Sequence, residues 1–143
     1  MSAREPMTIA EAQGRLATLW ISGAAVVGAL LLAQTVLGKY GGQTEKAWSW
    51  FAPTVFPTLT IIVTAWFGTA AAAREQTVEP RHFQMAFGLS LVYLAVVAGT
   101  LLVQPFSAWT PMELLAMSHA WLGPTQGLAG IGVGKFFASR GGA

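Results

Sequence analysis

Four long stretches without a single charged residue constrain this chain more than any other feature of its sequence. Each of them exceeds the roughly 20 residues that a helix needs to cross a hydrocarbon core of about 30 Å. Together they occupy most of the 143 residues, so the sequence predicts an all-α membrane protein in which residues 1–143 form one domain of four transmembrane helices, arranged as two helical hairpins. The four stretches are Leu16–Gly38, Ala47–Ala73, His82–Met112 and Leu114–Gly134.

The composition supports a membrane protein and excludes several kinds of chemistry. Only 10% of the residues are charged, against about 25% in a typical soluble domain. The chain contains no Cys, Asp or Asn, which excludes disulfides, thiolate nucleophiles and a Ser-His-Asp triad. Its net charge of +2 is small and scattered, unlike a nucleic-acid-binding surface. We therefore expect no catalytic residue, metal, cofactor or nucleic-acid partner, and an enzyme acting on lipid is the least favoured function.

Two capping boxes mark helix starts. Thr8 and Glu11 have the Thr-x-x-Glu spacing, and so do Thr110 and Glu113, with a proline between them at the first helical position. The first helix is therefore expected to begin near Thr8, ahead of the membrane. The predicted spans are about 15–38, 51–73, 82–104 and 111–137.

Prolines affect the second and fourth helices. Because proline is tolerated in a first helical turn, we expect the second helix to begin between Trp50 and Pro57 and to end near Ala73. Proline inside a helix removes a backbone donor and clashes with the preceding turn. The fourth helix is therefore predicted to be kinked at Gly123-Pro124.

The distribution of basic residues predicts the orientation. Cytoplasmic loops of membrane proteins carry an excess of Lys and Arg. Only Lys39 and Lys46 lie in the loops of one side, whereas the two termini and the middle loop carry six basic residues. Both termini are therefore expected in the cytoplasm, with a bacterial inner membrane as the location. The six are Arg4, Arg15, Arg74, Arg81, Lys135 and Arg140.

The fourth helix carries a stripe of glycine and polar residues along one side. With about 3.6 residues per turn, these residues lie on one side of the helix. They include two small-xxx-small pairs, which permit close approach of helices. Packing among the four helices, packing between protomers, and a glycine-lined pathway or hinge all remain open as its role. The stripe consists of His119, Gly123, Gln126, Gly127, Gly130 and Gly134.

Polar residues also recur on one face of the third helix and of the second. In lipid each polar group needs a partner, so these faces should contact protein or water. Helix packing and pore lining are both compatible with them. They are Ser90, Tyr93, Thr100 and Gln104 in the third helix, and Thr60, Thr64 and Gly68 in the second.

Two functions suit this pattern. The first is an oligomeric pore or channel, with His119 and Gln126 near the pathway. The second is a non-catalytic membrane subunit or anchor that binds a soluble cytoplasmic partner through Arg74–Arg81 or the termini. His82 and His119 are expected more than about 15 Å apart along the helices, which argues against a bis-histidine haem. The expected partners are thus the lipid bilayer, further copies of the chain and, in the second case, a soluble protein.

Overall fold

Four long helices form the protein over residues 6–69 and 75–138, the part of the chain that the computed structural model describes, with side chains described up to residue 134. No β-strand occurs within these ranges. Short 3-10 turns, η1 (Gly41–Gln43) and η2 (Gln104–Phe106), lie in the two tight connections. The helices are α1 (Ile9–Val36), α2 (Thr44–Gly68), α4 (Pro80–Val103) and α5 (Pro111–Ala138).

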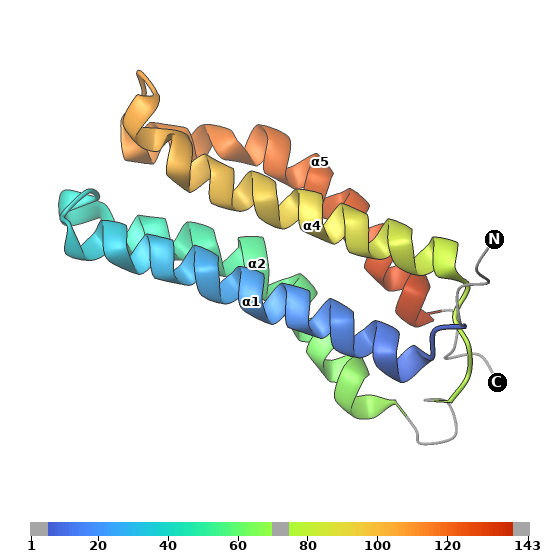
Figure 1. Ribbon diagram of the computed structural model, residues 1–143. Helices are drawn as coiled ribbons and strands as arrows, with labels where there is room; N and C mark the ends of the chain where they lie inside the picture. The colour runs from blue at the N-terminus through green and yellow to red at the C-terminus, as the bar shows by residue number, and fades with distance from the viewer. Residues whose placement is uncertain (1–5, 70–74, 139–143) are drawn as a thin grey trace.

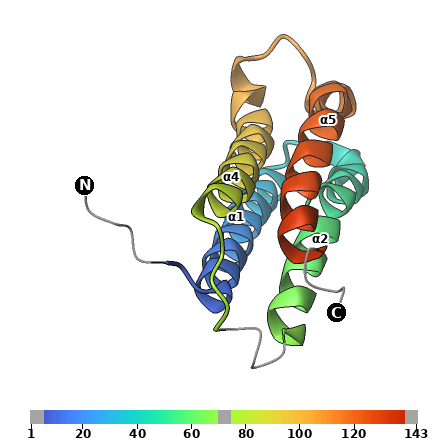
Figure 2. The same ribbon diagram turned by 90° about the vertical axis from the view of Figure 1, so that its right-hand side faces the viewer.

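The helices form two antiparallel hairpins that lie side by side. In Figures 1 and 2, α1 packs beside both α2 and α4, and α5 packs beside both α4 and α2. The tight connections 37–43 and 104–110 lie together at one end of the bundle, which we call the hairpin end. The starts of α1 and α4 and the ends of α2 and α5 lie at the opposite end, which we call the terminal end. The two pairs α1/α4 and α2/α5 therefore each contain parallel helices.

Both predicted capping boxes are confirmed. At the start of α1, the Thr8 hydroxyl accepts the Glu11 backbone N–H at 3.3 Å, and the Glu11 carboxylate accepts the Thr8 N–H at 3.5 Å. At the start of α5, the Glu113 carboxylate accepts both the backbone N–H and the hydroxyl of Thr110, at 2.9 and 2.8 Å. Each box satisfies backbone donors that a helix start leaves without a partner.

The expected start of α2 is wrong. The helix begins at Thr44, so Pro53 and Pro57 lie in its interior and not in its first turn. A proline there leaves the carbonyl four residues earlier without its helical donor, and a side chain of α5 supplies one of the missing donors. α2 ends at Gly68, because Thr69 is extended; Ala73 lies outside the described residues.

α5 is continuous through Pro124 over its whole length, and the kink at Gly123-Pro124 stays a prediction. Within the described residues, three helical segments are long and apolar enough to cross a membrane: Ile9–Val36, Gly41–Gly68 and Pro80–Phe106. This is compatible with an integral membrane protein. α5 is as long as α1, at 28 residues, but it is not among these three segments.

Side chains from all four helices fill the bundle axis. Trp20 and Tyr93 are both fully buried and their rings stack, with centroids 5.8 Å apart. Side chains packed this closely leave no room for a lumen along the axis of the described bundle. The largest buried side chains of the same cluster include Leu16, Leu31, Val55, Ile62, Val97 and Leu101.

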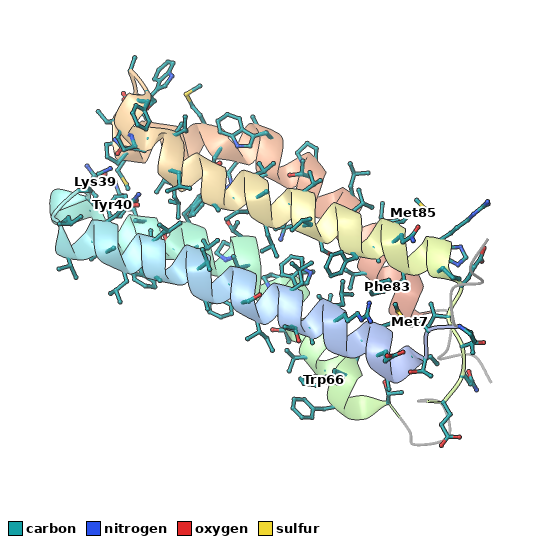
Figure 3. The ribbon with its side chains drawn as sticks, in the orientation of Figure 1. Met7, Lys39, Tyr40, Trp66, Phe83 and Met85 are labelled. Carbon is teal, nitrogen blue, oxygen red and sulfur yellow. The ribbon has the colours of Figure 1, made fainter. Side chains whose placement is uncertain are left out.

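A small second cluster packs between the starts of α1 and α4 at the terminal end. Residues on either side of the Thr8–Thr77 bridge pair through their backbones, with Ile9 N–H donating to the Gln76 carbonyl at 2.9 Å and Val78 N–H to the Met7 carbonyl at 2.9 Å. Beneath this bridge lies a group of packed apolar side chains, of which Figure 3 labels Met7 and Phe83. The bridge ties the segment before α1 to the loop before α4. The buried members are Ile9, Ala12, Val78, Phe83 and Ala86.

Candidate functional site

The polar stripe of α4 lies inside the bundle. Ser90, Tyr93 and Thr100 are buried. The Tyr93 hydroxyl donates to the Thr54 carbonyl of α2 at 2.6 Å. The Thr100 hydroxyl donates to the Val96 carbonyl at 2.9 Å and accepts the indole N–H of Trp121 at 3.2 Å. Tyr93 and Thr100 therefore join α4 to its neighbours.

Two buried polar atoms at the centre have no hydrogen-bond partner in the described part of the chain. They are the indole nitrogen of Trp20 and the hydroxyl of Ser90. Ser90 lies one turn before Tyr93, whose ring stacks on Trp20. A buried polar group without a hydrogen-bond partner costs free energy of folding. The centre of the bundle therefore contains two polar atoms whose hydrogen bonds the described residues do not supply.

Gln126 of α5 compensates for a proline of α2. Pro57 has no N–H to donate to the Pro53 carbonyl, and the Gln126 side-chain amide donates to that carbonyl at 3.1 Å. Nearer the hairpin end, the Trp50 indole donates to the Ser118 hydroxyl at 2.8 Å. Both contacts join α2 to α5.

Gln104 belongs to a polar network at the hairpin end. The Lys39 ammonium donates to its side-chain oxygen at 2.7 Å, and the Gln34 amide donates to the Leu101 carbonyl at 3.0 Å. The Tyr40 hydroxyl donates to the Gln34 side-chain oxygen, and burial raises the pKa of Tyr40 to about 12. Lys39 and Tyr40 are labelled in Figure 3. The network joins the two hairpins.

The glycine stripe of α5 does not bring helices together within the chain. Gly123 and Gly127 are exposed, and Gly130 and Gly134 are half-buried. A Cβ atom placed on any of the four would meet no heavy atom of another element within 4 Å. Alanines continue the stripe toward the hairpin end, so small residues follow one face of α5 along most of its length, with His119 exposed beside them. The exposed alanines are Ala116 and Ala120.

Thr60 and Thr64 of α2 are exposed as well. Their expected companion Gly68 is exposed at the end of the helix, with open space at its Cβ position. This face of α2 therefore points away from the bundle core. No contact between helices within the described chain explains its hydroxyls.

The glycines that do permit close packing are ones that the sequence pattern did not single out. A Cβ on Gly132 would lie 3.4 Å from the Ala86 Cα and 3.2 Å from the Leu89 side chain, so α5 approaches α4 closely there. A Cβ on Gly23 would lie 2.6 Å from the Leu94 side chain. Neither glycine belongs to a four-residue glycine repeat, and the sequence therefore offered no signal to distinguish them.

A groove of about 500 Å³ lies between α2 and α5 at the hairpin end. Apolar side chains form part of its wall, and Lys46, Glu113 and His119 also line it. His119 makes no hydrogen bond or ion pair to any residue in the described part of the chain. The other histidine, His82, lies at the terminal end, 3.2 Å from Glu79. The groove is lined by Gln43, Lys46, Ser49, Trp50, Pro53, Met112, Glu113, Leu115, Ala116 and His119.

Over residues 6–69 and 75–138, no group of three His, Asp or Glu side chains is arranged to hold a metal ion. No protein-family model matches the chain, and neither the curated proteins nor the solved structures that were compared with it gave a match.

Proposed function

We propose that the protein is a non-catalytic membrane subunit that assembles with further copies of its own chain. The face of α5 that carries the exposed glycines and alanines, which we call the small-residue face, holds this oligomer together. The observation that supports this is the open space beside Gly123 and Gly127. Glycine inside a helix costs roughly 0.5–1 kcal/mol relative to alanine, and lipid contact gives nothing in return. Close approach of a second helix offsets this cost, because small residues let two backbones pack against each other in a bilayer.

The polarity of α5 supports the same proposal. α5 lies antiparallel beside α4, which belongs to one of the three membrane-capable segments, so we infer that α5 crosses the membrane as the fourth span. Its exposed face contains His119 among glycines and alanines. Such a face interacts poorly with acyl chains, and cover by another protein helix removes it from lipid.

The orientation follows the positive-inside rule. Arg15 and Arg81 lie at the terminal end, and Lys39 and Lys46 at the hairpin end. Together with the other basic residues of the termini and the middle loop in the sequence, this distribution supports our proposal that the terminal end lies in the cytoplasm of a bacterial inner membrane. A soluble cytoplasmic partner would then meet the described segment 75–81.

Replacing Gly127 with leucine is expected to abolish assembly while leaving the fold intact, because the new side chain fills the space where two backbones should meet. Crosslinking in membranes and light scattering in detergent measure the oligomer. Gly99→Leu is the matched control, since Gly99 of α4 also has open space at its Cβ position and lies off the α5 face. Its assembly should match the wild type.

Two results would contradict the proposal. Equal assembly of Gly127→Leu and wild type would show that the α5 face is not the interface. A monomeric wild-type protein in detergent and in membranes would favour the alternative function, a subunit that depends on a soluble or membrane partner.

A pore is the second candidate, favoured by one observation: His119 is exposed on the same side of α5 as Gly123 and Gly127, without a hydrogen-bond partner in the described chain. If several α5 helices surround a common axis, this face lines it. Purified protein in liposomes should then release a small dye or conduct ions, and His119→Ala should change the conductance by a measurable factor. Wild-type liposomes that stay sealed across pH and voltage would exclude this candidate.

A further inference from the structure

The groove between α2 and α5 at the hairpin end has a polarity that runs from charged to apolar. Lys46 and Glu113 are exposed near its mouth, whereas Trp50 and Leu115 are buried in its wall. On α2 the lining runs from Gln43 to Pro53, about 15 Å of helical rise. A volume of about 500 Å³ lies in the range of about 300–1,000 Å³ that ligand sites occupy.

The mouth of the groove favours an anion at one position. α2 begins at the hairpin end, so its N-terminus with its partial positive charge flanks the mouth, whereas the Thr110–Glu113 capping box already satisfies the start of α5. The Gln43 side chain makes no capping hydrogen bond to α2 and accepts instead from the Lys46 ammonium at 3.5 Å. Lys46 adds a full positive charge within the first turn of the helix. Helix N-termini together with a lysine are a common setting for phosphate.

A cation fits beside this position. Glu113 lines the groove with a carboxylate whose Thr110 contacts use one oxygen, Oε2. Ser49 also lines the groove, and its carbonyl lacks the helical donor of residue 53 because Pro53 has no N–H. Both groups are acceptors, and both are best satisfied by a ligand that carries N–H donors.

Deeper along α5, His119 offers a donor without a partner in the described chain. It lies beyond Ala116 on the side away from the groove mouth. At this depth the next polar atoms of a membrane lipid, below its phosphate, are the ester carbonyls. These are acceptors for an imidazole N–H.

We infer that the groove binds a phospholipid with a primary-amine headgroup, a phosphatidylethanolamine. Its phosphate lies at Lys46 and the start of α2, its ammonium group contacts Glu113 and the Ser49 carbonyl, and one ester carbonyl accepts from His119. One acyl chain follows the apolar wall at Trp50. A free phosphoethanolamine lacks the acyl chain that this wall requires. The groove belongs to a single chain, but Ala116 and His119 line it and also lie on the small-residue face of α5, so the lipid and a neighbouring protomer would share the hairpin end of that face.

The test measures which lipids stay bound to the protein. Wild type is incorporated into vesicles of equal parts palmitoyl-oleoyl phosphatidylethanolamine, phosphatidylcholine and phosphatidylglycerol, extracted in mild detergent and weighed by native mass spectrometry. Phosphatidylethanolamine should be retained about tenfold over phosphatidylcholine, the factor expected for one charge-assisted hydrogen bond. Phosphatidylcholine is the discriminating competitor because its ammonium has no N–H.

Glu113→Gln should remove this preference and keep the fold, because glutamine also serves in a capping box. Glu45→Gln is the matched control, since Glu45 lies in the first turn of α2 and does not line the groove, and it should bind like the wild type. Lys46→Gln should lower retention of phosphatidylethanolamine and phosphatidylcholine alike. Three results would overturn the inference: equal retention of the three lipids by wild type, a preference for phosphatidylglycerol, or the same loss in Glu45→Gln as in Glu113→Gln. Light scattering of the same samples reports assembly separately.

Discussion

Replacing Trp20 with alanine is expected to lower the free energy of unfolding by about 3 kcal/mol, near the lower end of the range for buried aromatic residues. Trp20 is fully buried and stacks on Tyr93, so the substitution leaves a cavity in the middle of the bundle. The loss comes from packing contacts, because lipid is as apolar as the protein core and adds little transfer energy. Unfolding by sodium dodecyl sulfate in mixed micelles, followed by circular dichroism, measures it.

Trp20→Phe separates the ring from its N–H. The indole nitrogen of Trp20 is buried without a hydrogen-bond partner in the described chain, and phenylalanine keeps an aromatic ring while removing this donor. The phenylalanine variant should therefore lose less than about 1 kcal/mol, since the smaller ring and the removed polar atom offset each other. A loss as large as that of alanine would mean that the N–H has a partner, such as a bound water, that contributes to stability.

Replacing Gln126 with methionine is expected to lower the free energy of unfolding by about 2 kcal/mol, because it leaves the Pro53 carbonyl without a donor. Methionine has nearly the same length as glutamine, so the packing of α5 on α2 is retained. The same micelle titration measures the effect. The Pro53 carbonyl depends on Gln126 because Pro57 lacks the N–H that would otherwise donate to it.

A double-mutant cycle tests that cause. In a Pro57→Ala background the restored N–H donates to the Pro53 carbonyl, and Gln126→Met should then cost less than about 0.5 kcal/mol. If Gln126→Met is as costly with alanine at position 57 as with proline, the amide stabilises the bundle in some other way. If it is neutral in both, the hydrogen bond between Gln126 and Pro53 contributes nothing.

Local signals in the sequence predicted much of the helical layout. The Thr-x-x-Glu boxes at Thr8 and Thr110 place the starts of α1 and α5, because a capping box needs only residues three apart. The uncharged stretches predicted the helices themselves, since each must be long and apolar to lie in a membrane.

The α5 stripe shows the limit of local patterns. Periodicity correctly grouped small residues such as Gly123 and Gly127 on one face, but it left open whether that face packs within the chain. The structure leaves it exposed and uses Gly132 for the close approach to α4. The difference depends on which side of α5 the other helices occupy, and a repeat within one helix carries no information about its neighbours.

What the sequence by itself determined is thus the all-helical class, the positions of most helix ends and the membrane character of three segments, because these depend on contacts within a few residues or on composition. What only the tertiary structure decided is the start of α2 and the roles of its prolines. Pro57 can lie inside the helix because Gln126, 73 residues from Pro53 along the chain, donates to the carbonyl that the proline leaves free. A hydrogen bond between two helices exists only once both are packed, so no local pattern around the prolines could reveal it.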